Sequence, residues 1–108
     1  MKNNLQKVLL GLLITGFIST SYAINVNVHS TSSAVTALGF KANGNKHGGL
    51  GKSYEGKDMP KGSYAFGVRV KGKDVPCLSA GKRKVTLNKD TEATLVLKGG
   101  KCTVTLDS

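Results

Sequence analysis

The chain has 108 residues, two cysteines, no tryptophan and a formal net charge of +10. This length excludes a multidomain protein, and an aromatic content of 6% leaves little for a surface that stacks nucleic-acid bases. The charge favours anionic partners such as phospholipid headgroups, or sulfated and acidic polysaccharides. We expect no sequence-specific binding of nucleic acid.

The N-terminal segment has the features of a secretory signal peptide. Lys2 and Lys7 come before an apolar run, Val8–Ile18. Small residues at Ser21 and Ala23 then fit cleavage after Ala23. The run is shorter than the roughly 20 apolar residues that span a membrane. We therefore expect residues 1–23 to be removed on export to the periplasm or the medium. Removing 23 of the 108 residues leaves 85, with no transmembrane segment.

The mature chain alternates apolar and polar residues in short runs, as half-buried β-strands do. Glycine, asparagine and aspartate separate these runs as turn residues. We expect an all-β fold, a single small antiparallel β-sandwich of about seven strands, with a small barrel as the alternative. The alternating runs are 24–29, 33–41, 63–70, 75–79, 84–88, 93–98 and 102–107.

Two cysteines, Cys77 and Cys102, fall in two of these predicted strands. In an exported protein an even pair of cysteines predicts a disulfide. Closing a loop of about 25 residues stabilises a chain by about 3–4 kcal/mol in the chain-entropy model. Because Cys102 faces inward by alternation, we expect this disulfide to cross the core.

Residues 43–62 interrupt the alternation with many glycines, and we expect them to form a long Gly/Lys-rich loop with a role in binding. The segment contains NGNKHGGLGKS, which ends like a nucleotide-binding phosphate loop. Lys46 stands where that motif needs its first glycine, and no helix follows. Nucleotide binding is therefore excluded, but successive glycines can still expose backbone N–H groups to an anion.

Strand counting predicts where the charge lies. If every strand crosses the body once, successive connections alternate between two ends, and the whole net charge of residues 24–108 falls at the end where Ile24 begins. The residues expected at this basic pole are Lys41, Lys46, Lys52, Lys57, Lys61, Lys82, Arg83, Lys84, Lys98 and Lys101, with Glu55 and Asp58. The other end receives Arg69, Lys71, Lys73 and Lys89 with Asp74, Asp90, Glu92 and Asp107.

The two histidines give no strong sign of catalysis. His29 and His47 are expected at opposite ends, so they do not share a metal ion. His29, Asp107 and a nearby serine are the right types for a catalytic triad, but nothing marks a strained nucleophile turn. We expect no enzymatic activity, no cofactor and no metal site.

The sequences MPKGSYAFGVRV and KVTLNKDTEATLVL resemble the Pro-x-Gly-x-Tyr strand and following strands of prealbumin-like sandwiches, such as carboxypeptidase-regulatory-like and Cna-B-type domains. The resemblance covers Met59–Leu97. It implies a binding or structural module. The short leader and the basic mature chain also resemble small exoproteins that Legionella-type bacteria release by type II secretion, which implies a role in virulence or host interaction.

We therefore expect an exported, non-catalytic module whose basic pole binds anionic lipid headgroups, including phosphoinositides, or sulfated or acidic glycans. The alternative is a protein–protein module, an adhesive subunit or an inhibitor of an exported enzyme, that binds a host or envelope protein through 43–62. The sequence does not indicate an oligomeric state. The expected anion-binding residues are Lys46, His47, Lys52, Lys82, Arg83, Lys84, Lys98 and Lys101.

Overall fold

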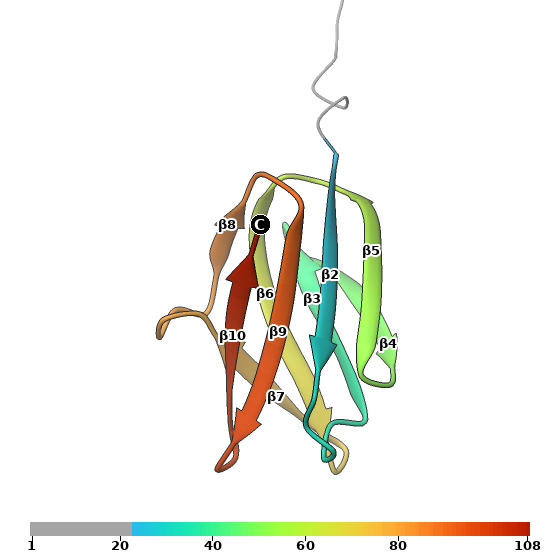
Figure 1. Ribbon diagram of the computed structural model, residues 1–108, viewed down its shortest axis with the longest axis vertical. Coiled ribbons are helices and arrows are strands. Elements are labelled where there is room, and N and C mark those ends of the chain that lie inside the picture. The colour runs from blue at the N-terminus through green and yellow to red at the C-terminus, as the bar shows by residue number, and fades with distance from the viewer. Residues whose placement is uncertain (1–22) are drawn as a thin grey trace, which may run out of the picture.

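The computed structural model describes residues 23–108, so the expected signal peptide lies outside the described residues except for Ala23. The described part contains only strands and the turns that join them (Figure 1). No helix that could cross a membrane occurs within residues 23–108. The strands are β2 (Ile24–Ser30), β3 (Ala37–Ala42), β4 (Asn45–Leu50), β5 (Ser53–Met59), β6 (Gly62–Val70), β7 (Lys73–Leu78), β8 (Val85–Leu87), β9 (Thr91–Lys98) and β10 (Lys101–Asp107).

The strands form one continuous, barrel-like sheet in place of the two separate layers of a sandwich. Their order is β4-β3-β6-β7-β10-β9-β2-β5, with β8 paired to β6. The all-β prediction is confirmed. Most neighbours are antiparallel as expected, but β7 with β10 and β2 with β9 are parallel. We call β4-β3-β6-β7 the first half-sheet and β10-β9-β2-β5 the second half-sheet.

The core lies between the two half-sheets and follows from the alternation in the sequence. Val26 and Val28 of the second half-sheet and Phe40, Tyr64 and Phe66 of the first half-sheet are almost fully buried. Phe40 contacts Tyr64 and Phe66 with ring centroids 5.4 and 5.9 Å apart. Because successive side chains of a strand point to opposite faces, the residues between these buried ones form the outer surface.

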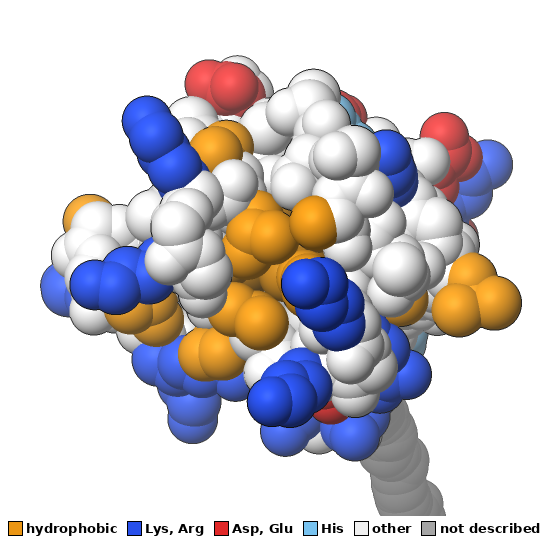
Figure 2. Space-filling view, turned by 90° about the horizontal axis from the view of Figure 1, so that it is seen from below, with side chains coloured by type: hydrophobic (Ala, Val, Ile, Leu, Met, Phe, Trp, Pro, Cys, Tyr) orange, Lys and Arg blue, Asp and Glu red, His pale blue; other side chains and the backbone are white. Residues whose placement is uncertain are grey.

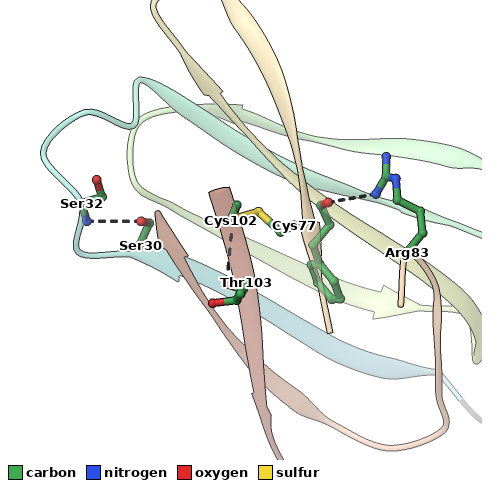
Figure 3. The surroundings of a disulfide bond; sticks show 7 residues. Ser30, Ser32, Cys77, Arg83, Cys102 and Thr103 are labelled. Carbon is green, nitrogen blue, oxygen red and sulfur yellow. Dashed lines mark hydrogen bonds between the residues drawn. A yellow bond between two sulfur atoms is a disulfide. The ribbon is translucent and has the colours of Figure 1, made fainter. Parts of the chain in front are cut away.

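The predicted Cys77–Cys102 disulfide is confirmed, but it does not cross the core as expected: it joins neighbouring strands where the two half-sheets meet (Figure 3). Cys77 of β7 and Cys102 of β10 are direct register partners with Cα atoms 4.4 Å apart. Both are buried. Only one further pair, Leu78 with Thr103, joins these strands, so the covalent bond secures the shortest parallel joint in the sheet.

The segment 43–62 is not the long loop predicted from its composition. It holds strands β4 and β5, separated only by Gly51 and Lys52. Both strands lie at edges of the sheet, and β4 has little buried surface. Edge strands with exposed residues on both faces need no apolar alternation, which is why the pattern did not reveal them.

The predicted basic pole is also wrong, because β7 and β8 run in the same direction. Both pair antiparallel with β6, along successive lengths of that strand, and 79–84 only bulges out between them. Every later connection therefore lies at the opposite end from the prediction. The Asn25 N–H donates to Asp90 Oδ1 at 2.9 Å, which places that acid beside the start of β2. Acids and lysines thus occur at both ends.

The connection from β5 to β6 is held by side-chain hydrogen bonds. The Tyr64 hydroxyl donates to the Pro60 carbonyl, and the Ser63 N–H donates to Asn43 Oδ1 at 2.8 Å. Gly62 has φ 142°, and a Cβ there would overlap the Asn43 side chain. These contacts explain the order of proline, glycine and tyrosine in this segment.

Candidate functional site

A shallow groove of about 480 Å³ lies on the outer surface of the first half-sheet, which we call the groove face. Gly39, Gly67 and Pro76 lie side by side on β3, β6 and β7. Their neighbours Phe40 and Phe66 point into the core, so these three residues point outward. The floor of the groove is therefore nearly free of side chains.

Gly39 has a second reason to be glycine. It pairs with Gly48 of β4, and a Cβ on Gly39 would lie 2.9 Å from Gly48 Cα and overlap the His47 carbonyl oxygen. Gly48 has φ 153°, which side chains rarely adopt. The close approach of β3 and β4 thus depends on both glycines, and it shapes one end of the groove.

Cations from four parts of the chain line this groove. Lys41 and Lys46 are opposite each other on β3 and β4. Arg69 lies on β6, and Arg83 comes from the bulge 79–84. The one acidic side chain among the lining residues is Asp74. The groove therefore carries an excess of positive charge over a floor of backbone.

Arg83 is held in place by the shape of its bulge. The Ser79 and Lys82 backbones exchange two hydrogen bonds, of 2.9 and 2.8 Å, around Ala80 and Gly81, which have φ 49° and 80°. This two-residue turn sends the chain back toward β6. Arg83 Nη1 then donates to the Phe66 carbonyl at 3.3 Å (Figure 3). One of five guanidinium donors is used, so others remain for an anion.

The acid in the groove is already paired. Arg69 Nε donates to Asp74 Oδ1 at 2.9 Å, and both side chains are more than half exposed. This bond and the charge of Arg69 hold the pKa of Asp74 below its ordinary value, and the charge of Lys46 adds to the lowering. Lys46 of β4 thus adds to the positive charge around this carboxylate of β7.

The structure brings together Lys46 and Arg83 of the predicted anion-binding residues, but not the others. The His47 ring packs on Phe40, with centroids 5.5 Å apart, and does not join the cations, although the residue borders the groove. Lys52 lies in the turn between β4 and β5. Five of the predicted anion-binding residues do not line the groove: Lys52, Lys82, Lys84, Lys98 and Lys101.

Lys82 and Lys84 flank Arg83 in the bulge. Lys98 and Lys101 face each other across the turn from β9 to β10, on the second half-sheet. Figure 1 shows this turn and the turn from β4 to β5 on different sides of the molecule. The eight predicted residues therefore form at least three separate groups.

Sequence reasoning missed Lys41 and Arg69, although a signal for them was present. Ala65 and Gly67 are small residues at outward positions of β6, and Arg69 is the next outward residue of the same strand. Small outward residues beside a cation suggest a surface kept clear of side chains. Placing Lys41 beside them required the register of β3 on β6, which alternation alone does not provide.

Figure 2 looks along the barrel from the end that is lowest in Figure 1, and it shows how the charged side chains are distributed. Figure 2 shows most Lys and Arg side chains gathered along one side of this end, with apolar side chains exposed near its middle. Leu50 of β4, which borders the groove, is 87% exposed. The groove thus combines positive charge with an apolar residue at its rim.

No metal or triad geometry is assembled among residues 23–108. No three His, Cys, Asp or Glu side chains in this range converge on one point. His29 and Asp107 lie on β2 and β10, which are separated by β9. Two strand spacings amount to roughly 9.6 Å, so this pair is not in hydrogen-bond contact.

No family model, curated protein or solved structure matches the chain. The case for a function therefore depends on the geometry and charge of the groove face.

Proposed function

We propose that the protein is an exported, non-catalytic binding module whose groove face binds anionic groups displayed on a surface. The observation that carries this proposal is the cluster of Lys41, Lys46 and Arg83 around a floor of Gly39 and Gly67. An anion can approach the backbone there without meeting intervening side chains.

The chemistry of the lining residues defines what kind of anion fits. Lysine acts as a hydrated point charge, which gives strong but loose attraction, whereas Arg83 can form directed hydrogen bonds with a sulfate, phosphate or carboxylate. The ligand is therefore an anionic group on a phospholipid headgroup or on a sulfated or acidic glycan. In both cases binding weakens as salt rises.

A salt-titrated binding assay tests this proposal and separates the two sources. The probes are heparin, alginate, and phosphatidylcholine vesicles with and without phosphatidylglycerol or a phosphatidylinositol phosphate. Selective binding to the vesicles would identify a lipid headgroup, and selective binding to the polysaccharides a glycan. No binding to any probe at low salt would refute the proposal.

A matched pair of variants tests the location. The variant Lys41→Ala, Lys46→Ala, Arg83→Gln should bind about tenfold more weakly or worse, because each lost surface charge contributes about 0.5 kcal/mol. The control Lys57→Ala, Lys98→Ala, Lys101→Ala removes the same number of positive charges from the second half-sheet. Equal weakening in both would mean that net charge, and not the groove, binds the anion.

A further inference from the structure

Strands β4 and β5 are neighbours in sequence but lie at opposite ends of the sheet order. Among residues 23–108, β4 pairs only with β3, and β5 pairs only with β2. The two strands are connected by Gly51 and Lys52, yet they do not pair with each other as a hairpin (Figure 1). Within this part of the chain, each of these strands therefore has one edge without a partner strand.

One hydrogen bond identifies the backbone groups on the free edge of β4. The Gly51 N–H donates to the Thr36 carbonyl at 2.8 Å, so the backbone N–H of Gly51 points toward the β3 side of β4. Because the bonding direction alternates along an antiparallel strand, Lys46, Gly48 and Leu50 direct their N–H and C=O groups away from β3. This row of donors and acceptors is a template for a further strand.

The side chains beside this row specify the partner. Lys46 and Leu50 point to the outer surface, Lys46 faces Lys41 on β3, and Gly48 between them has no side chain. In an added strand, the residue opposite Lys46 meets two positive charges and the residue opposite Leu50 meets an exposed apolar side chain. A large side chain opposite Gly48 would cover the glycine floor of the groove.

We propose that β4 receives an extended acidic peptide segment of a partner protein by antiparallel strand addition. The segment places a carboxylate opposite Lys46, a large apolar residue opposite Gly48 and an aliphatic residue opposite Leu50. A second copy of this chain is a poor occupant, because it would bring two basic groove faces together. The proposal depends on the backbone edge, so it does not rest on the binding of polyanions.

The probe is a short, capped peptide that contains Val-Thr-Phe-Thr-Glu. Binding should slow hydrogen exchange at the backbone amides of Lys46, Gly48 and Leu50 in the full mature chain. A peptide N-methylated at Val, Phe and Glu loses the donors that face β4 but keeps every charge. It should bind about tenfold more weakly or worse, because several hydrogen bonds are lost.

Peptide N-methylation at the two threonines is the matched control, because those donors face away from β4, and binding should persist. Equal binding of both methylated peptides would overturn strand addition. The variant Lys46→Glu should bind the peptide at least tenfold more weakly, and replacing the glutamate of the peptide by lysine should restore binding to this variant. If the lysine peptide does not restore binding, the requirement for an acidic partner is overturned.

Sedimentation measurements test whether a second copy of this chain occupies the edge of β4. If the free protein forms a dimer that protects the same β4 amides, a second copy occupies the edge and the proposal fails. Binding of the same samples to heparin, alginate and the anionic vesicles is measured in parallel. Peptide binding without binding to any of these polyanions would refute the proposed function alone, and polyanion binding without peptide binding would refute strand addition alone.

Discussion

The outer surfaces of the two half-sheets have similar strand geometry but different side chains. On the groove face, Lys41, Lys46, Arg69 and Arg83 surround small residues, and Asp74 is the one acid that lines the groove. On the second half-sheet, threonines occupy the central outward positions, and exposed cations are matched by a similar number of acids. The exposed charged residues on its strands are Lys57, Lys98 and Lys101 with Glu55, Asp58, Glu92 and Asp107.

At the centre of the second half-sheet side chains bind one another, whereas the centre of the groove face is left open. Asn27 Nδ2 donates to Glu92 Oε2 at 2.8 Å, across β2 and β9. On the groove face the corresponding central positions are Gly39 and Gly67, which have no side chains to pair. The difference between the two surfaces shows that the open, basic groove results from what the outward residues lack as much as from their charge.

The disulfide variant should have the largest effect, because it loosens the joint between the two surfaces. Cys77→Ser with Cys102→Ser should lower the free energy of unfolding by about 3 kcal/mol, since only Leu78 and Thr103 also pair there. Urea unfolding followed by circular dichroism measures this. A loss below about 1 kcal/mol would show that the other strand pairs hold the half-sheets together without help.

A larger residue on the groove floor should have the next largest effect. Gly39→Val should destabilise the fold by about 2 kcal/mol, because the new side chain would force β3 away from Gly48 of β4. Thr103→Val, on the exposed second half-sheet, should change stability by no more than about 0.5 kcal/mol. Similar losses for both variants would contradict the difference between the two surfaces.

Tyr64 lies between the surfaces and should have an intermediate effect. Tyr64→Phe removes the hydrogen bond to the Pro60 carbonyl and should cost about 1 kcal/mol in thermal or urea unfolding.

The same variant should also change the alkaline pH dependence. Burial raises the pKa of Tyr64, so the folded state favours the neutral phenol. The corresponding stability is present below the unfolded pKa of about 10 and is lost as pH rises through the higher folded value. Unfolding measured across this range should show a fall in stability that is smaller in Tyr64→Phe. Identical curves would contradict a buried phenol.

The smallest effect is expected at Asp74. Asp74→Asn should strengthen heparin binding about twofold at neutral pH, because it removes one negative charge from the groove and frees Arg69. Asn27→Asp, which adds a charge to the second half-sheet, is a control that should leave binding nearly unchanged. Weaker binding by Asp74→Asn would show that the ion pair positions Arg69 for the ligand.

The contribution of the ion pair to folding has its own pH dependence. The pKa of Asp74 is lowered in the folded state. Its contribution is therefore present above the ordinary aspartate pKa of about 3.9 and is lost as pH falls through the lower folded value. Acid unfolding of the wild type and of Asp74→Asn should differ only above that lower range.

The parts of the fold with strong alternation could be predicted from the sequence. The strands around Val26, Phe66, Leu95 and Val104 follow from apolar periodicity, and the disulfide follows from an even pair of cysteines in two of the predicted strands. Edge strands could not be predicted, because β4 buries almost nothing and so has no apolar pattern.

The site was predicted only in part. Lys46 and Arg83 come together, but their meeting depends on the pairing of β3 with β4 and on the bulge at 79–84. Strand counting treated that bulge as a reversal of the chain, and it thereby assigned Lys98 and Lys101 to the wrong end. Composition indicated an anionic ligand, whereas register determines which cations meet.

The bulge at 79–84 leaves the sheet and returns to it without changing the direction of the chain. Because β7 and β8 are each anchored on β6, residues added between Ala80 and Gly81 would extend into solvent and leave the pairing on both sides unchanged. Such a site allows length and sequence to vary beside the groove at little cost to the fold. It is therefore a suitable point for the insertion of a peptide tag.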